Sequence, residues 1–330
     1  MLAKLNHALV LLLGILSLFF NVTLEACSRI LWNNSVNRVA ARTMDLSVDE
    51  KPTFTVLPRG LSREGCGDHH SIKWSSKYGS VVVTAFEANA ISEGMNEKGL
   101  SAHLLLLEGT EYELRDSRPS LSNGLWIQYM LDNFSSVKDV IDSLKSFQVV
   151  STEVGGRYWE LHACLEDPSG DSAIIEYVDG KIVVYHGPQH VVMTNEPTYD
   201  IQIKNLQRYR YFGGDLPLPD DIDSESRFVR CAVLLKTLPD PKNLKEAIDR
   251  VFEAIRTVQA PFRDTRWISA IDVTNLTYYF CSISTGNIFW IDLKNLDFLP
   301  RQSVRSINPH DPSFSGEISN RFIPHQTIPA

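Results

Sequence analysis

The feature that most constrains the fold is a long succession of short, apolar, strand-like segments in which helices occur only in groups. Turn residues separate several of these segments, among them Asn33-Asn34-Ser35 and Asp179-Gly180. The predicted strands are 28–32, 38–42, 53–57, 79–86, 100–107, 160–164, 172–178, 181–185, 268–273, 278–284 and 288–293. The predicted helices are 125–133, 137–147, 201–212, 227–238 and 244–258. Antiparallel runs of strands with grouped helices favour an α+β fold of two packed sheets with helices outside.

The N-terminal residues have the pattern of a secretory signal peptide. Lys4 precedes an apolar run over residues 8–20, and a polar stretch then ends at Ala26. The run is shorter than the ~20 residues that span a bilayer comfortably, so no membrane span is expected after its removal. We therefore expect export to the periplasm or the medium, removal of residues 1–26, and a single domain over residues 27–330. The tail, about 300–330, contains five prolines and is expected to be extended or loosely ordered.

Cys27 is expected to become the first residue of the mature chain. A free N-terminal cysteine carries a nucleophilic thiol and an α-amine, whose ordinary pKa of about 7.7–8.0 suits a base near neutral pH. The segment 24–27 also resembles a bacterial lipobox, although Glu25 fits that pattern poorly. Both interpretations place the cleavage before Cys27, but a lipid-modified Cys27 would lose the thiol and the base together.

The net charge excludes two classes of partner. The charge of −8 and the pI near 5.6 argue against binding to nucleic acid or to an anionic membrane.

The chain has four cysteines besides Cys27, namely Cys66, Cys164, Cys231 and Cys281. The odd total leaves at least one thiol unpaired or in an intermolecular bridge. Apolar neighbours indicate buried thiols for the last three. Residues 66–70 hold metal-ligand types at a spacing too tight for a usual zinc site, so we interpret them as a loop.

Several short motifs occur in one order along nearly the whole mature chain. They are Cys27-Ser28-Arg29, Ala41-Arg42-Thr43-Met44-Asp45, Pro58-Arg59-Gly60, the run 74–81 (WSSKYGSV), the run 93–100 (EGMNEKGL), Asn133-Phe134-Ser135-Ser136-Val137, the run 194–200 (TNEPTYD) and Ser226-Arg227-Phe228. Each motif alone is weak, but together they are specific. In this order the chain resembles the choloylglycine hydrolase family of N-terminal-nucleophile enzymes, and most of all its Gram-negative branch.

The resemblance implies a four-layer αββα sandwich and a set of catalytic residues. Cys27 would be the nucleophile, Arg42 would stabilise its thiolate, and Asp45, placed at a strand end, would hold the α-amine. A guanidinium beside a thiol lowers the thiol pKa, which is the direction that catalysis requires. Without the resemblance, Arg42 and Asp45 would be interpreted as a surface ion pair.

The resemblance also implies an oxyanion hole. Asn195 would donate from its side-chain amide, the backbone N–H of Leu106 would be the second donor, and Arg227 would orient the site. Many bile-salt hydrolases have Asn where this chain has Leu106, so their substrate specificity does not transfer directly. Taken alone, Asn195 fits a turn residue and Arg227 fits a helix start.

The implied activity is hydrolysis of linear amide bonds in N-acyl compounds through an acyl-thioester, without cofactor or metal. Conjugated bile salts, penicillin V and N-acyl homoserine lactones are the substrates that the family suggests, and a homotetramer is the assembly. One alternative is a non-catalytic lipoprotein of the same fold, anchored through Cys27. Another is a ceramidase-like N-acyl amidase, although those enzymes usually remove a longer pro-segment.

Overall fold

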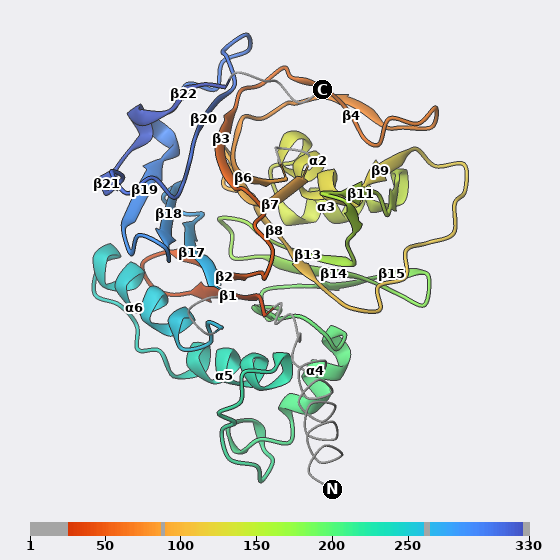
Figure 1. Cartoon of the computed structure of the whole chain (residues 1–330). Coiled ribbons are helices and arrows are strands. Elements are labelled where there is room, and N and C mark those ends of the chain that lie inside the picture. Colours follow the sequence, from red (N-terminus) through yellow and green to blue (C-terminus); the bar gives the residue numbers. More distant parts are fainter. Residues whose placement is uncertain (1–25, 87–89, 261–264, 326–330) are drawn as a thin grey trace, which may run out of the picture.

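The computed structural model describes residues 26–86, 90–260 and 265–325, and two large sheets packed face to face dominate it (Figure 1). One sheet has the strand order β16-β1-β2-β17-β18-β19-β21, with bounds β1 Ser28–Asn33, β2 Arg38–Asp45, β16 Val192–Met193, β17 Thr265–Asp272, β18 Thr277–Ser282, β19 Ile288–Asp292 and β21 Gly316–Glu317. The other has the order β15-β14-β13-β8-β7-β6-β3-β20-β22, with bounds β3 Thr53–Leu57, β6 Ser80–Ala85, β7 Ala90–Asn96, β8 Ser101–Leu106, β13 Leu161–Glu166, β14 Ser172–Val178, β15 Lys181–His186, β20 Arg305–Ile307 and β22 Ile323–Pro324.

Helices cover the outer faces of both sheets. The helices are α2 Trp126–Asn133, α3 Val137–Ser143, α4 Tyr199–Leu206, α5 Ser224–Thr237 and α6 Leu244–Arg256. Helix α6 packs on β2 and β17 and α5 packs on β1, whereas α2 packs on β7 and β8 of the other sheet. The layers therefore run helix, sheet, sheet, helix, which confirms the expected αββα sandwich.

Short elements complete the described part of the chain. The 3-10 helices are η1 Asn123–Leu125, η2 Leu144–Ser146, η3 Arg210–Phe212, η4 Leu293–Asn295 and η5 Ser319–Arg321. Two-stranded sheets pair β4 Ser62–Glu64 with β5 Lys73–Ser75, β9 Ser120–Ser122 with β10 Gln148–Val150, and β11 Glu153–Val154 with β12 Arg157–Tyr158.

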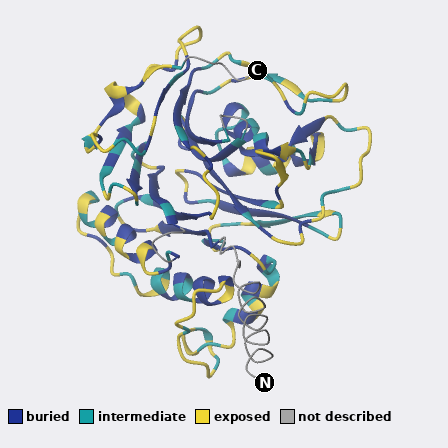
Figure 2. Ribbon diagram, in the orientation of Figure 1, coloured by how far each residue is buried: buried dark blue, intermediate teal, exposed yellow. Residues whose placement is uncertain are grey.

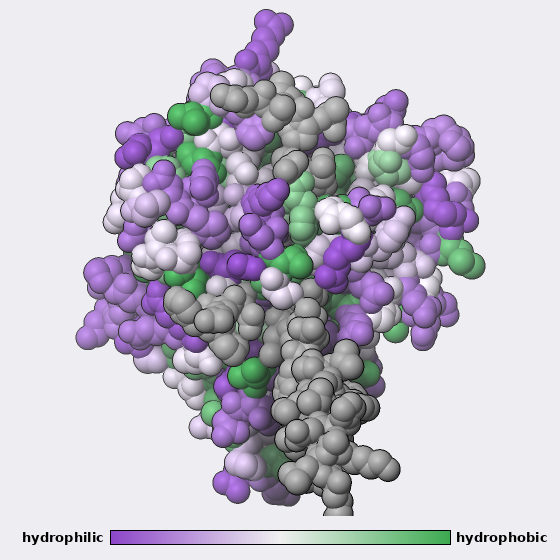
Figure 3. All heavy atoms as spheres, in the orientation of Figure 1, coloured by the Kyte–Doolittle hydropathy of each residue, from purple (hydrophilic) through white to green (hydrophobic). Residues whose placement is uncertain are grey.

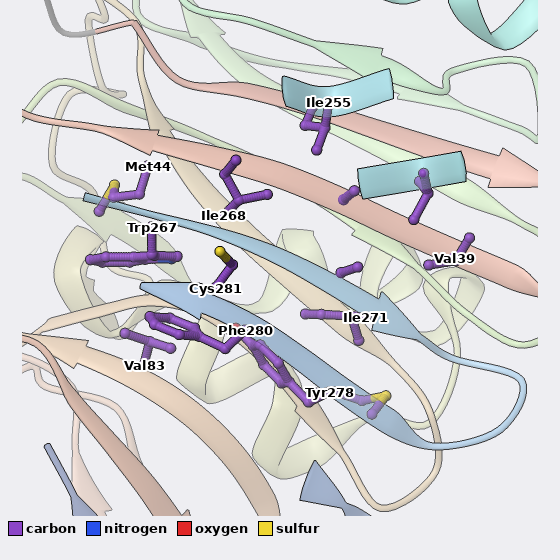
Figure 4. Packing of buried hydrophobic residues seen from close by; sticks show 14 of the residues in the cluster. Val39, Met44, Val83, Ile255, Trp267, Ile268, Ile271, Tyr278, Phe280 and Cys281 are labelled. Carbon is purple, nitrogen blue, oxygen red and sulfur yellow. The ribbon is translucent and has the colours of Figure 1, made fainter. Parts of the chain in front are cut away.

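Aromatic rings fill the space between the two sheets. Phe54 of β3 meets Tyr278 and Phe280 of β18 edge to face, with ring centroids 4.8 and 5.4 Å apart. Figure 4 shows Val83 of β6 beside these rings, while Ile255 of α6 lies on the opposite side of the seven-stranded sheet. Successive residues of a strand point to opposite faces, so one sheet contributes to both the inter-sheet core and the sheet–helix core.

Helix α6 illustrates why these layers form. Its inward positions are apolar, including Val251 and Ile255, whereas Lys245 and Asp249 form an exposed ion pair four residues apart. The Asn243 side chain caps the first turn by accepting from the N–H of Glu246 at 3.0 Å. Figure 2 shows the result, with buried strands at the centre and helices that are exposed on their outer faces.

The outer surface is largely polar, in line with the charged composition. Figure 3 shows hydrophilic side chains spread over the visible face, with small hydrophobic groups between them. Among residues 26–86, 90–260 and 265–325, no helix has the length and apolar character needed to cross a membrane. Apart from Ala26, the predicted leader lies outside the described residues, so its interpretation as a signal peptide stays a prediction.

Most predicted strands and helices recur in the structure, with differences mainly at their ends. The predicted helix 201–212 is wrong beyond Leu206, because Tyr209 is extended and bridges to Leu216 before the separate 3-10 helix η3. The turn at Asp179-Gly180 has positive φ at both residues, 49° and 68°, as a two-residue hairpin requires. Strand β2 is longer than the predicted strand 38–42. It ends at Asp45, in agreement with the predicted position of this residue at a strand end. Strand β7 was not predicted. The tail is extended as expected, but residues up to 325 are not loosely ordered, because β20 and β22 join the nine-stranded sheet.

Candidate active site

Cys27 lies just before β1, buried between the start of that strand and the end of β2. The β1–β2 ladder pairs Ser28 with Thr43, which brings the first residues of the domain next to Met44 and Asp45. The Cys27 side chain is 3% exposed, and its Sγ lies 3.7 Å from the carbonyl oxygen of Asp45. The fold therefore places this thiol at the open end of the β1–β2 hairpin, where it faces the nine-stranded sheet.

The Arg42 guanidinium contacts the Cys27 thiol. Its Nη2 donates to Cys27 Sγ at 3.6 Å, and its Nη1 donates to the carbonyl oxygen of Ser92 at 2.9 Å. Its Nε lies 3.9 Å from the Glu93 carboxylate, and both side chains are fully buried. Arg42 belongs to one sheet and Glu93 to the other, so this pair joins the two sheets beside the Cys27 thiol.

A chain of buried charges extends from Glu93 away from the thiol. His103 lies between two carboxylates, with Nδ1 3.1 Å from Glu93 and Nε2 2.8 Å from Glu166. Glu166 in turn binds the guanidinium of Arg29. The two carboxylates raise the pKa of His103 against the opposing effect of burial, and the cations Arg29 and His103 hold the pKa of Glu166 at about 2. This network holds Glu93 as a carboxylate next to Arg42.

The sequence analysis missed this network. Glu93 lies in a quoted motif, but the unpredicted strand β7 hid its position. His103 lies within the predicted strand 100–107, where a titratable residue in an apolar run is the signal that could have indicated a buried partner.

Burial outweighs Arg42 in setting the reactivity of the thiol. Loss of solvent raises the pKa of Cys27, whereas the charge of Arg42 lowers it and the charge of Asp45 raises it. The net shift is upward, opposite to the lowering that the sequence predicts from Arg42 alone. The thiol is therefore mainly protonated at neutral pH, and its attack on a carbonyl would need a base to remove the proton.

Arg227 contacts the backbone on the other side of Cys27. It lies in α5 and is buried, and its Nη1 donates to the carbonyl oxygens of Ala26 and Cys27 and to Ser28 Oγ at 2.5, 2.6 and 2.7 Å. Its Nη2 donates to Asn195 Oδ1 at 3.1 Å. One guanidinium thus fixes both the start of β1 and the orientation of the Asn195 amide.

The orientation of Asn195 follows from its partners. A guanidinium can only donate, so the amide oxygen faces Arg227 and the amide nitrogen faces the other way. That nitrogen donates to the carbonyl oxygen of Leu106 at 2.9 Å, which leaves its second hydrogen for another acceptor. Asn195 lies two residues after β16, and β16 pairs with β1, so the sheet brings Asn195 close to Cys27 from a distant part of the sequence.

The backbone of Leu106 points toward the same place. The N–H of Leu107 donates to the carbonyl oxygen of Glu160 on the β13 side, so the N–H and C=O of Leu106 face away from β13. The C=O of Leu106 accepts from Asn195, and its N–H has the same direction. The β7–β8 ladder ends at the pair Glu93–His103, so Leu106 has no ladder partner in β7.

Asp45 is buried and held by neutral groups. Its carboxylate accepts from the hydroxyls of Thr43 and Thr265, and from the N–H of Ala260 at 3.3 Å. Burial raises its pKa, against the lowering effect of these donors. With Ala26 still attached, no hydrogen bond among the described residues joins this carboxylate to the nitrogen of Cys27. The Thr43 hydroxyl also accepts from the N–H of Ser28 at 3.1 Å, so it connects the Asp45 carboxylate to the residue after Cys27.

Cys27 lines a mainly apolar cavity whose empty space, including the part open to solvent, is about 580 Å³. The sequence places the loops that determine specificity at residues 45–70 and 106–120, and these ranges supply Leu46, Glu50 and Leu106 to the cavity walls. The rest of the walls was not predicted and includes Met44, Phe86, Ile91, Leu104, Val154, Trp159 and Leu161.

The remaining cysteines and the His-rich loop lie apart from this cavity's wall. Cys164, Cys231 and Cys281 are buried free thiols, as predicted. Cys66 lies in a loop, with its Sγ 2.9 Å from Ser120 Oγ. In the described part of the chain, no three His, Cys, Asp or Glu side chains are grouped so that they could hold a metal ion.

Comparison with known proteins places these residues in context. Residues 27–307 match the family described as linear amide C-N hydrolases, choloylglycine hydrolase family, so the match begins at Cys27. A penicillin V acylase of Pectobacterium atrosepticum is 35% identical over 91% of each chain. A bile salt hydrolase/transferase of Clostridium perfringens is 26% identical, over 78% of this chain and 89% of the relative.

A solved structure agrees with these sequence relatives. Penicillin V acylase from Agrobacterium tumefaciens superposes with a TM-score of 0.83 and 35% identity, covering 91% of this chain and 98% of that one. A conjugated bile acid hydrolase from Clostridium perfringens, variant R18L, superposes with a TM-score of 0.72 at 21% identity, which supports the fold alone.

Proposed function

This chain belongs to the choloylglycine hydrolase family of linear amide C–N hydrolases, and we propose that it uses Cys27, freed as the mature N-terminal residue, as its nucleophile. One observation carries the proposal. Cys27 Sγ lies against the Arg42 guanidinium in the wall of an apolar cavity, while Arg227 holds both the Cys27 carbonyl and the Asn195 amide.

The raised pKa of the thiol assigns the first proton transfer to a base. The α-amine of Cys27 removes the thiol proton as Sγ attacks the amide carbon of the substrate. The same group, now an ammonium, gives a proton to the leaving amine as the C–N bond breaks. An acyl-thioester remains, and water activated by the α-amine then releases the carboxylic acid and the thiol.

Two donors would stabilise the negative charge on the substrate oxygen. The second hydrogen of Asn195 Nδ2 is one, and the backbone N–H of Leu106 is the other. Arg227 prevents the Asn195 amide from turning over, because an amide nitrogen cannot accept from a guanidinium. Arg42 stabilises the sulfur as it develops negative charge.

Asp45 acquires its role when residue 26 is removed. A new ammonium at Cys27 would lie near this carboxylate, whose present donors are neutral groups. The attraction would lower the pKa of Asp45 and hold the amine in place for proton transfer. Asp45 is therefore proposed as a positioning residue.

The substrate is proposed to be an N-acyl amide with an apolar acyl group, because the cavity beside Cys27 is mainly apolar. The 35% identical penicillin V acylases favour compounds of that type over conjugated bile salts. Export with loss of residues 1–26 and assembly into a homotetramer complete the proposal.

Hydrolysis assays on purified mature protein test this function. Penicillin V, a glycine-conjugated bile salt and an N-acyl homoserine lactone would be assayed for release of the free amine. Cys27→Ala should abolish turnover while thermal unfolding stays close to wild type, and Cys66→Ala serves as the matched control with full activity. Turnover retained by Cys27→Ala would refute the assignment of the nucleophile.

A further inference from the structure

Glu50 is a buried carboxyl group in the wall of the cavity that also holds Cys27. It lies in the segment after β2 and is 1% exposed. Among the described residues, neither of its carboxylate oxygens has a hydrogen-bond partner. A buried acceptor without a partner is costly, so its presence in an otherwise apolar wall calls for a ligand.

Nearby cations do not satisfy this carboxyl. Arg266 Nε lies 3.9 Å from Glu50 Oε2, beyond hydrogen-bond distance. The same Nε donates to the carbonyl oxygen of Leu46 at 2.8 Å, and Nη2 donates to that of Ser47 at 3.1 Å. Arg266 therefore fastens the segment that carries Glu50 without pairing closely with its carboxyl.

Other polar side chains in the cavity wall are already engaged. Asn123 donates to the carbonyl oxygen of Trp159 at 2.7 Å and accepts from the N–H of Thr152 at 3.2 Å. Arg42 is held by the carbonyl oxygen of Ser92 and by Glu93. Glu50 thus differs from these neighbours in having both oxygens free for a ligand.

We propose that Glu50 is a specificity residue of the acyl pocket, and that its neutral carboxyl donates a hydrogen bond to an acceptor oxygen, such as a keto or ether oxygen, carried by the acyl group of the substrate. The inference rests on the proposed function, in which the acyl group occupies this cavity. It names acyl groups with an oxygen substituent as preferred over plain alkyl groups.

The protonation state of Glu50 makes the preference depend on pH. Burial raises the pKa of Glu50 to about 7; its own backbone N–H, Arg266 and Arg42 lower it, and Asp49 raises it. Below this pH the carboxyl has a proton to donate, whereas above it the carboxylate repels an acceptor oxygen. A hydroxyl substituent can donate instead, so its binding should persist at higher pH.

The test compares matched acyl amides that share one leaving amine. One series has a keto or ether oxygen at successive chain positions, a second has hydroxyl groups there, and a third has methylene groups. At pH 6 the wild type should favour the best keto or ether compound over its methylene partner by about tenfold in kcat/KM. The ratio should fall toward one at pH 8.5, while the hydroxyl series keeps its advantage.

Two substitutions separate hydrogen bonding from ionisation. Glu50→Gln keeps a donor and should keep the preference at both pH values, whereas Glu50→Leu should lose it. Glu153→Gln, at an exposed carboxylate of β11 that does not act on the pKa of Glu50, is the matched control and should behave as wild type. Thermal unfolding of each variant checks folding, and binding of the same amides to Cys27→Ala measures recognition without turnover.

The outcomes distinguish a failure of this inference from a failure of the proposed function on which it rests. Equal kcat/KM for keto, ether and methylene compounds at pH 6, with good turnover of all, would overturn the role of Glu50 alone. A preference that Glu50→Leu retains would overturn it as well. Absence of hydrolysis for every amide would overturn both proposals.

Discussion

Arg42 and Arg227 are both buried arginines that contact Cys27, yet their surroundings differ. Arg42 contacts the sulfur and lies near the Glu93 carboxylate, which raises its pKa against the opposing effect of burial. Arg227 contacts carbonyl oxygens and the Asn195 amide, and burial lowers its pKa despite the attraction of Asp45. The same side chain can therefore tune a nucleophile electrostatically or hold a backbone geometrically.

Removing Arg227 should give the largest effect. In Arg227→Met, the Cys27 carbonyl, Ser28 Oγ and Asn195 Oδ1 all lose their donor in a buried place. Each unsatisfied buried acceptor costs about 1–3 kcal/mol, so we expect a total loss of about 3 kcal/mol or more in the free energy of unfolding. Urea denaturation measures it, and a loss below about 1 kcal/mol would contradict the geometric role.

Asn195→Ala should have the second-largest effect, and it should lower turnover and not the free energy of unfolding. It removes one proposed donor to the oxyanion while Arg227 keeps its backbone contacts. Loss of such a donor typically lowers kcat about 100- to 1000-fold. Steady-state kinetics on the best amide would show a reduced kcat with a nearly constant KM. A change in KM alone would assign Asn195 to substrate binding.

Arg42→Met should change thiol reactivity more than stability. Glu93 would keep His103, Trp267 and Ser269 as partners, so its carboxylate stays satisfied. Arg42 lowers the pKa of Cys27, so loss of the cation should raise that pKa further and leave less thiolate at neutral pH, with alkylation roughly tenfold or more slower. The rate of Cys27 alkylation by iodoacetamide against pH measures this shift. An unchanged profile would remove Arg42 from the electrostatic role.

The conservative changes should give the smallest effects and the sharpest contrast. Arg42→Lys keeps a charge near the sulfur and should lose less than about tenfold in kcat/KM, with an alkylation profile close to wild type. Arg227→Lys loses the planar fork that joins Cys27 to Asn195 and should be the more damaged variant. Equal losses in the two variants would mean that both arginines act only as charges.

The sequence predicted most of the layers because local patterns carry that information. Asp179-Gly180 fixes its hairpin through positive φ values, and the periodicity of 244–258 indicates the amphipathic helix α6. Strand β7 was not predicted, because Glu93 and Gly94 interrupt the alternation of apolar residues that indicates a strand. The burial of Glu93 depends on partners in the opposite sheet, such as Trp267, which donates to Glu93 at 2.7 Å.

The candidate site was predictable only where a family pattern covers it. Cys27, Arg42 and Asn195 occur in ordered motifs, and the fold brings them together as expected. Glu50 lies outside those motifs, and its burial depends on a loop geometry that no local rule gives. The upward shift of the Cys27 pKa likewise depends on desolvation by both sheets, which the sequence does not display.

The most direct test of the account is the chemical state of Cys27 in the active protein. Intact mass and N-terminal sequencing would be combined with acid quenching during turnover of a slow amide substrate. The account predicts a chain that begins at Cys27 with a free amine, and an acyl adduct on the peptide that carries Cys27. A fully active chain that retains residue 26, or carries a lipid on Cys27, would contradict it.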